Sequence, residues 1–264
     1  MLKIDNLSVC TTTNIQILNN VSMKLEIGEC IGLTGASGSG KSTLIKTIIG
    51  IDDTQIIPTN GIIEANNINV LKLSSNERRK LCGKTFGFIP QSPITSFFPN
   101  AKIGKQLIAT IKLHSDKALT MKQINELAIL SLESVNLKDT NRILNAYPCE
   151  LSGGMLQRVT MAIILALKPK YILADEPTSA LDNENAEILM SLLAECKNSG
   201  ILFISHDVKA LKTLCSSIIV MESGKVIENQ TTDELFLNPQ ELWTKEFVHS
   251  HNSGSEVNKW IKLN

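Results

Sequence analysis

The chain has 264 residues, of which 43% are hydrophobic and 20% are charged, an ordinary composition for a folded globular protein. Its 26 lysines and arginines balance its 26 aspartates and glutamates, so the formal net charge is zero. This balance argues against a protein that binds nucleic acid through bulk positive charge. At this length we expect one large domain, or one domain with a sizeable insertion, that needs no disulfide bonds for stability.

Strand and helix patterns alternate along most of the chain. Up to about residue 27, apolar and polar residues mostly alternate, which is typical of strands. Short apolar runs predict further strands at 30–34, 62–64, 86–89, 171–174, 201–204 and 217–221. Helical spacing predicts helices at 42–49, 158–167 and 186–197, and a helical block between 103 and 145. Strands that alternate with helices predict an α/β core with a parallel sheet covered on both faces, into which helices at about 92–155 are inserted.

The sequence also argues against a membrane span and a secretory leader. The longest apolar run, at 159–167, is less than half of the roughly 20 residues that a span requires. The N-terminal residues contain no apolar stretch and no small-residue cleavage site. Six scattered cysteines, none of them in a C-x-x-C pair, are typical of buried, reduced thiols in the cytosol. We therefore expect any role at a membrane to depend on a partner.

A glycine-rich loop lies between the strand predicted at 30–34 and the helix predicted at 42–49. It fits the pattern G-x-x-x-x-G-K-[ST], in which backbone N–H groups and a helix N-terminus surround a phosphate. The expected nucleotide-binding residues are Gly35, Ala36, Ser37, Gly38, Ser39, Gly40, Lys41, Ser42 and Thr43. Lys41 is expected to supply a positive charge for the terminal phosphates, and the Ser42 hydroxyl to bind Mg²⁺. The alternative, a glycine turn that only caps a helix, is disfavoured by the strand–loop–helix context.

Two consecutive carboxylates, Asp175 and Glu176, follow the strand predicted at 171–174. Neighbouring residues of a strand point to opposite faces, so one carboxylate can serve a metal ion and the other an attacking water. We assign Asp175 to Mg²⁺, directly or through water, and Glu176 to the water. Taken alone, the pair would be interpreted as solvated acids that open a turn at Pro177, and only the phosphate loop favours the catalytic interpretation.

Four further motifs accompany the phosphate loop and the Asp175-Glu176 pair. Leu151-Ser152-Gly153-Gly154-Met155 begins 24 residues before Asp175, and the others are Phe88-Ile89-Pro90-Gln91, Ser179-Ala180-Leu181-Asp182 and Ile204-Ser205-His206-Asp207. With the phosphate loop, they resemble the LSGGQ signature, Q-loop, D-loop and switch histidine of ATP-binding-cassette (ABC) ATPases. The resemblance covers roughly residues 1–240.

The resemblance implies a P-loop (RecA-like) ATPase core at 1–91 and 156–240 that carries an N-terminal antiparallel β subdomain. It also implies an α-helical signature subdomain at 92–155 and a C-terminal tail at 241–264. ATP and Mg²⁺ are the implied cofactors. Gln91 would sense nucleotide and contribute to the Mg²⁺ site, His206 would contact the γ-phosphate, and Glu176, His206 and Gln91 would form the catalytic set. In the family's head-to-tail dimer, the signature loop and D-loop of one subunit would close the ATP site of its partner. The residues of this chain implied in that role are Ser152, Gly153, Gly154 and Asp182.

The family's usual partners are two membrane permease subunits and, indirectly, an extracytoplasmic substrate-binding protein, with no nucleic acid. We therefore expect a peripheral protein on the cytoplasmic face of the cell membrane, paired with a paralogous second ATPase. The permease is expected to dock on the helical insertion. The adjacent Phe97 and Phe98 either contribute to that interface or are buried beneath the helical block, and the sequence leaves both open.

The wider motifs resemble the peptide/nickel importer branch. Gln91-Ser92-Pro93-Ile94-Thr95-Ser96 is similar to that branch's Q-x-P-x-[TS]-[SA], and G-G-M-L-Q-R at 153–158 is closer to its nickel-type first ATPase subunit. We expect import of nickel or a metal chelate, with di- or oligopeptide import and a soluble non-transport ABC ATPase as alternatives. One departure is the lack of an aromatic residue after the first strand, where Ile15 and Ile17 are aliphatic. We therefore expect weak base selectivity and a modest affinity for ATP.

Overall fold

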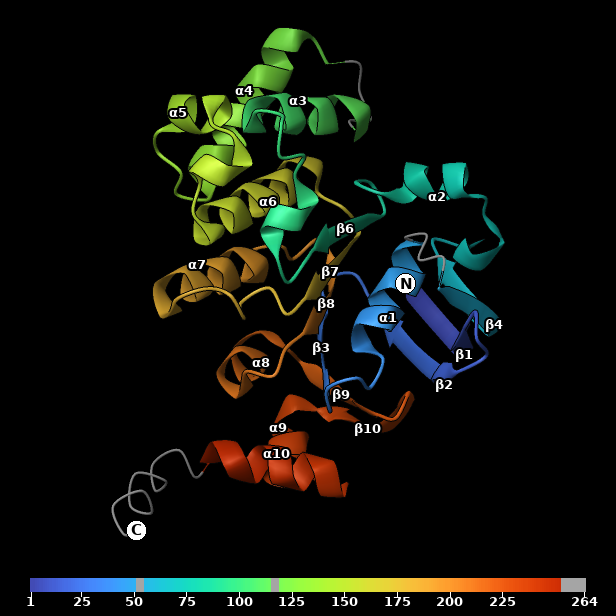
Figure 1. The fold of residues 1–264 in the computed structure, drawn as a ribbon. Helices are drawn as coiled ribbons and strands as arrows, with labels where there is room; N and C mark the ends of the chain where they lie inside the picture. Colours follow the sequence, from blue (N-terminus) through green and yellow to red (C-terminus); the bar gives the residue numbers. More distant parts are fainter. Residues whose placement is uncertain (51–54, 115–118, 253–264) are drawn as a thin grey trace.

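Two β-sheets organise the structure, which is a computed structural model that describes residues 1–50, 55–114 and 119–252 (Figure 1). The larger sheet has six strands in the order β10-β9-β3-β8-β7-β6, and the smaller has four in the order β2-β1-β4-β5. The strands of the larger sheet are β3 (Cys30–Gly35), β6 (Phe86–Ile89), β7 (Tyr171–Asp175), β8 (Gly200–Ile204), β9 (Ser217–Glu222) and β10 (Lys225–Thr231). The smaller sheet contains β1 (Leu2–Thr11), β2 (Gln16–Leu25), β4 (Ile56–Ala65) and β5 (Ile68–Asn69).

The larger sheet is parallel except at one edge. β3 pairs with β8 and β9, and β7 pairs with β6 and β8, all in parallel, whereas β10 pairs antiparallel with β9. The central strands are buried on both faces, which explains why they are continuous apolar runs. The smaller sheet is antiparallel throughout, and the expected strand at 62–64 is the last part of the longer β4.

The six-stranded sheet separates two apolar cores. Along β8, Ile201 and Phe203 pack on the side of the helical region, whereas Leu202 and Ile204 pack on the side of α1 and the four-stranded sheet. Figure 1 shows α7 and α8 on the first side of the sheet and α1 on the second. The phosphate loop therefore lies between the small sheet and the large one, at the carboxyl end of β3.

The helices cover both faces of the larger sheet and form a group of their own above it (Figure 1). The α-helices are α1 (Lys41–Ile49), α2 (Ser75–Leu81), α3 (Ile103–His114), α4 (Met121–Ser134), α5 (Thr140–Asn145), α6 (Gly153–Leu167), α7 (Asn183–Ala194), α8 (Val208–Leu214), α9 (Thr232–Leu237) and α10 (Leu242–Asn252). Short 3₁₀ helices lie at η1 (Val70–Lys72), η2 (Pro93–Ser96) and η3 (Pro148–Glu150). The expected fold class is confirmed: an α/β core carries an antiparallel sheet and an inserted helical region in which α6 packs against α3 and α4.

Three sequence-based expectations about local structure are wrong. The helix expected from 158 begins five residues earlier, because the Ser152 hydroxyl caps α6 by accepting from Met155 N at 3.3 Å. The helix expected at 186–197 is α7, which begins after the capping residue Asp182 and ends at Ala194. The expected burial of the cysteines holds only for Cys215, since Cys149 is exposed and the other four are half-buried.

The last described segment forms the helix α10, so part of the expected tail is ordered. The buried carboxylate of Glu228 accepts from Gln240 N at 2.9 Å and from Glu241 N at 3.3 Å, just before the helix begins. The Trp243 and Phe247 rings stack with their centroids 5.1 Å apart. The remainder of the expected tail, 253–264, lies outside the described residues.

Candidate functional site

The phosphate loop joins β3 to α1 and is pressed against two neighbouring strands. Gly35 has a φ of 141°, and a Cβ there would lie 1.9 Å from the carbonyl oxygen of Met221 in β9. Gly40 has a φ of 98°, and a Cβ there would lie 2.6 Å from Leu18 Cδ2 in β2. Only glycine fits these two positions, so the tight curl of the loop is fixed by the sequence.

Lys41 begins α1, and its ammonium group lies inside the loop. Nζ donates to Gly35 O and Ala36 O, each at 2.8 Å. Burial lowers the pKa of Lys41, and the negative charges of Glu176 and Asp175 oppose that shift. A buried cation held by two backbone carbonyls is available to an incoming phosphate, whose oxygens are stronger acceptors.

Asp175 ends β7 and lies next to the phosphate loop. Its Oδ1 accepts from the Ser42 hydroxyl at 3.1 Å, and burial raises the pKa of its carboxyl. Two hard oxygen donors side by side suit Mg²⁺. Within the described part of the chain, no group of three or more His, Cys, Asp or Glu residues could hold a metal ion. A Mg²⁺ ion at Ser42 and Asp175 would therefore take most of its ligands from nucleotide and water.

The side chains of Glu176 and Asp175 point in different directions, but strand alternation, the reason expected from the sequence, is not the cause. β7 ends at Asp175, and Glu176 has a φ of 45°, in the left-handed region. Its backbone N–H still donates to Ile204 O at 3.0 Å. A left-handed glutamate is an uncommon conformation that the surrounding structure must hold in place. The side chain is therefore aimed by this turn and not by the strand.

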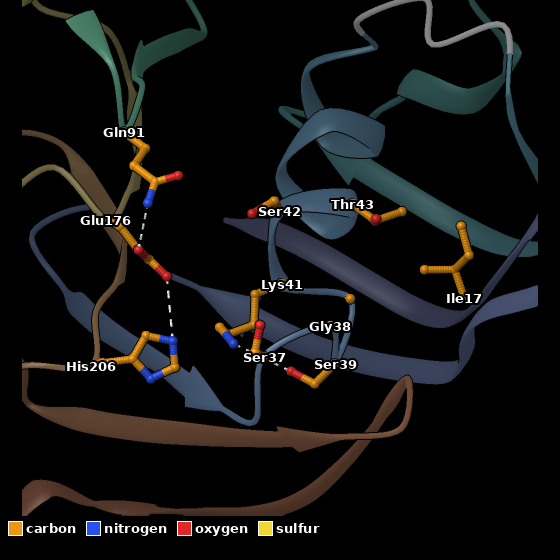
Figure 2. Close-up of a pocket in the computed structure, with 11 residues that line it drawn as sticks. Ile17, Ser37, Gly38, Ser39, Lys41, Ser42, Thr43, Gln91, Glu176 and His206 are labelled. Carbon is orange, nitrogen blue, oxygen red and sulfur yellow. Dashed lines mark hydrogen bonds and ion pairs between the residues drawn. The ribbon is translucent and has the colours of Figure 1, made fainter. Parts of the chain in front are cut away.

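The Glu176 carboxylate is held from two sides (Figure 2). Its Oε2 accepts from Gln91 Nε2 at 2.9 Å, and its Oε1 lies 3.3 Å from His206 Nε2. Gln91 follows β6 and His206 follows β8, so three parallel strands bring these side chains to one edge of the sheet. The structure thus brings together the three residues predicted as the catalytic set.

A cavity of about 390 Å³ opens between this carboxylate and the phosphate loop. It is lined by Ile17, Ser37, Gly38, Ser39, Gly40, Lys41, Ser42, Thr43, Gln91, Glu176 and His206. Gly35, Ala36 and Asp175 stand behind this lining and contact Lys41 and Ser42. Of the two aliphatic residues near the first strand, Ile17 reaches the cavity, whereas Ile15 is exposed. The arrangement can bind a polyphosphate, orient a cation and present a carboxylate to a water molecule.

The second glycine loop does not reach this cavity. Ser152 caps α6, which begins with Gly153 and Gly154, and Asp182 caps α7 by accepting from Asn185 N at 2.8 Å. None of the four predicted residues, Ser152, Gly153, Gly154 and Asp182, lines the cavity. Within one chain the two glycine loops thus form separate potential anion sites.

Two residues that contact the predicted site segments were not predicted from the sequence. Gln157 of α6 donates from Nε2 to Pro177 O at 3.1 Å, and Asn185 of α7 donates from Nδ2 to both carboxylate oxygens of Asp182 at 2.9 Å. The available signal for Gln157 was its helical spacing with Thr160 and Ile164, which are also buried.

Comparison with known proteins agrees with this geometry. The family model described as ABC transporter matches residues 18–179, more than half of the chain. The metal-staphylopine import system ATP-binding protein CntD of Staphylococcus aureus is 35% identical over 249 residues, covering 93% of this chain and 91% of its own. The dipeptide transport ATP-binding protein DppD of Lactococcus lactis subsp. cremoris is 36% identical over 253 residues, covering 92% of this chain and 71% of its own.

A solved structure shares the fold as well. The dimeric post-hydrolysis state of the ATP-binding cassette MJ0796, bound to ADP and Pi, has a TM-score of 0.77 at 29% identity. The similarity covers 88% of this chain and 99% of that one. In the described residues, no helix is both long enough and apolar enough to span a membrane. The chain therefore belongs to the ABC transporter family and is one of its ATPases.

Proposed function

We propose that this chain hydrolyses MgATP in the cavity between the phosphate loop and Glu176, and that hydrolysis drives the import of nickel or a metal chelate. The observation that carries the catalytic part is the position of the Glu176 carboxylate. It lies across the cavity from Lys41 and is held at 2.9 Å by Gln91 and at 3.3 Å by His206 (Figure 2).

The phosphate loop binds the nucleotide. Backbone N–H groups along residues 35–43 surround the phosphates at the N-terminus of α1, and Lys41 exchanges its two carbonyl acceptors for phosphate oxygens. His206, after β8, contacts the γ-phosphate from the opposite wall. Ile17 lies beside the adenine, where an aliphatic side chain gives contact area without aromatic stacking.

Ser42 and Asp175 hold Mg²⁺, and Gln91 is a further oxygen donor. In Figure 2 the Gln91 amide nitrogen faces Glu176, while its oxygen points toward the side of the cavity where Ser42 lies. When bound, Mg²⁺ neutralises charge on the phosphate oxygens. Glu176 accepts a proton from the attacking water and is oriented for this by its contacts with Gln91 and His206.

The ATPase acts as a head-to-tail dimer, and its second subunit is a paralogue. Ser152, Gly153 and Gly154 lie at the exposed start of α6, away from this chain's own cavity. Their helix N-terminus supplies a second set of N–H donors for phosphate, so we place them, with Asp182, over the partner's nucleotide. Each ATP is then enclosed by the phosphate loop of one subunit and the α6 start of the other.

The permease docks on the helical signature subdomain, residues 92–155, next to the ATPase core at 1–91 and 156–240. Phe97 is 7% exposed and belongs to the core, whereas Phe98 is 76% exposed. Phe98 borders a cavity of about 290 Å³ whose lining includes Ala101, Gln106 and Ala109. An exposed aromatic beside an apolar hollow is typical of a contact site. Two permease subunits bound here would hold the chain at the cytoplasmic face of the membrane, with a substrate-binding protein engaged only indirectly.

A metal chelate is the first candidate cargo. The metal-staphylopine relative is 35% identical over 93% of this chain, and the G-G-M-L-Q-R form at 153–158 resembles the nickel-type first ATPase subunit. Peptide import is the second candidate, because the dipeptide relative is 36% identical over 253 residues. A soluble, non-transport role is the third, and co-purification with two permeases separates it from the others.

Uptake measurements distinguish the two cargoes. The gene is deleted and complemented either by the native chain or by Glu176→Gln, and cellular nickel, cobalt and zinc are measured by mass spectrometry in chelator-supplemented medium. Metal import predicts that only the native chain restores metal content. Restored uptake of a labelled dipeptide, with metal content unchanged in all strains, would establish the peptide alternative.

A further inference from the structure

We propose that Gln157 of α6 is a positioning residue for ATP hydrolysis, because its side chain fixes the turn that carries Glu176. The inference rests on the proposed role of Glu176. It adds a residue outside the cavity, since Gln157 does not line it and its side chain donates to the backbone of Pro177, next to Glu176.

The turn after β7 needs external support. Glu176 has a φ of 45°, and its carbonyl oxygen accepts from Ser179 N at 3.1 Å and from Ser179 Oγ at 2.9 Å. These bonds close the turn on itself. Pro177 has no N–H, so its carbonyl oxygen is its one backbone hydrogen-bonding group. That oxygen accepts from Gln157 Nε2 at 3.1 Å, which ties the turn to α6.

Packing alone does not account for a glutamine at this position. Gln157 is 1% exposed, and its Oε1 has no hydrogen-bond partner among the residues that the structure describes. A methionine would fill a similar volume without leaving a buried acceptor unpaired. The amide thus supplies one directed hydrogen bond while its other polar atom remains unsatisfied.

A second contact links α6 to the chain that follows the Glu176 turn, at Asn185. The Asn185 side chain, held by Asp182, lies 3.0 Å from the position that a Cβ on Gly154 would occupy. Helix α6 therefore touches the chain from Glu176 to Asn185 near both ends. In the proposed dimer the start of α6 meets the partner's ATP, so a shift of α6 on that contact moves the Glu176 turn through Gln157.

The test compares two variants of Gln157 with a matched control in the assembled transporter. Gln157→Met removes the donor at similar volume, and Gln157→Glu places a carboxylate oxygen against Pro177 O. The control is Thr160→Val, which removes a buried hydroxyl one turn along α6 whose partner is Leu156 O within the helix. Phosphate release, the KM for MgATP, ATP affinity and the melting temperature are measured for each, at a temperature where circular dichroism shows all of them folded.

A positioning role predicts a loss in kcat alone. Gln157→Met should lower kcat by about tenfold to a hundredfold, the scale of a misplaced catalytic group, with KM and ATP affinity unchanged. Gln157→Glu should lower kcat further, and Thr160→Val should match the native chain. Native-like kcat in Gln157→Met overturns the proposal, as does an equal loss of kcat and ATP affinity, which indicates a structural role. Native-like turnover in Glu176→Gln would instead refute the catalytic role of Glu176, so failure of the proposed function can be told apart from failure of the proposal for Gln157.

Discussion

Replacing Glu176 with glutamine tests the proposed hydrolysis most directly. The change exchanges one carboxylate oxygen for an NH₂ group of nearly the same shape, so the left-handed turn and the cavity should persist. The amide retains an acceptor for one of the two contacts, with Gln91 at 2.9 Å or His206 at 3.3 Å. The Gln91 amide can also flip to present its oxygen to the new NH₂ group. We expect the melting temperature to change by only a few degrees.

The effect on turnover should be large. A positioned general base contributes about 10²–10⁴ in rate, and the amide cannot accept the proton. This range corresponds to about 3–5.5 kcal/mol of activation free energy. Binding should respond in the opposite direction. The Asp175 pKa is raised mainly by burial and further by the charge of Glu176. Removing that charge also removes its repulsion of the ATP phosphates, so ATP affinity should be retained or increased.

Phosphate release is measured at saturating MgATP, and ATP affinity by calorimetry, for the native chain, Glu176→Gln and a charge-matched control. Glu126→Gln, an exposed carboxylate on α4, serves as that control and should match the native chain. Native-like turnover in Glu176→Gln would refute the reasoning. So would a loss of ATP binding equal to the loss of turnover, because the carboxylate would then support the site rather than the reaction.

Three other substitutions test the remaining parts of the site. Lys41→Ala should weaken ATP binding at least about a hundredfold by removing the buried cation, with an unchanged circular dichroism spectrum; unchanged affinity would mean that the loop is only a turn. Ile17→Tyr should tighten ATP and GTP alike by about fivefold, since a ring beside the cavity adds about 1 kcal/mol of base stacking; calorimetry showing no gain would place the base elsewhere. Phe98→Ala should weaken co-purification with the permease or abolish cargo uptake while the isolated chain binds ATP normally. Leu237→Ala, which changes a similarly exposed apolar residue on α9, is its control, and normal assembly and uptake in Phe98→Ala would contradict the docking role.

Much of the fold was predictable because its signals are local. The central strands are apolar runs because they are buried on both faces. The phosphate loop requires glycine at positions 35 and 40, and one short sequence motif contains both glycines. Helical periodicity alone missed the early start of α6, because Gly153 and Gly154 carry no apolar side chain, although the glycine motif implied a helix start at these residues. Its cap, Ser152, is the local signal for that start.

Other features depend on contacts between distant residues and could not be predicted from the sequence. Phe97 and Phe98 are chemically identical neighbours, yet one is 7% exposed and the other 76%, because only the packing of the helical region distinguishes them. The left-handed turn at Glu176 is hydrogen-bonded to Ile204 and, through Pro177 O, to Gln157, and both residues are distant in sequence. The sequence named Glu176 as a candidate, and its carboxylate does line the cavity, but the expected reason for its direction, strand alternation, was wrong.

The six-stranded sheet gives neighbouring residues of one strand opposite surroundings. Leu202 and Phe203 are adjacent in the chain, but Leu202 packs on the side of the phosphate loop and Phe203 on the side of the helical region. Truncating Leu202 would therefore leave a cavity in the core beneath the phosphate loop, whereas truncating Phe203 would leave one beneath the helices. One strand thus offers two adjacent positions from which the packing on each face of the sheet can be perturbed separately.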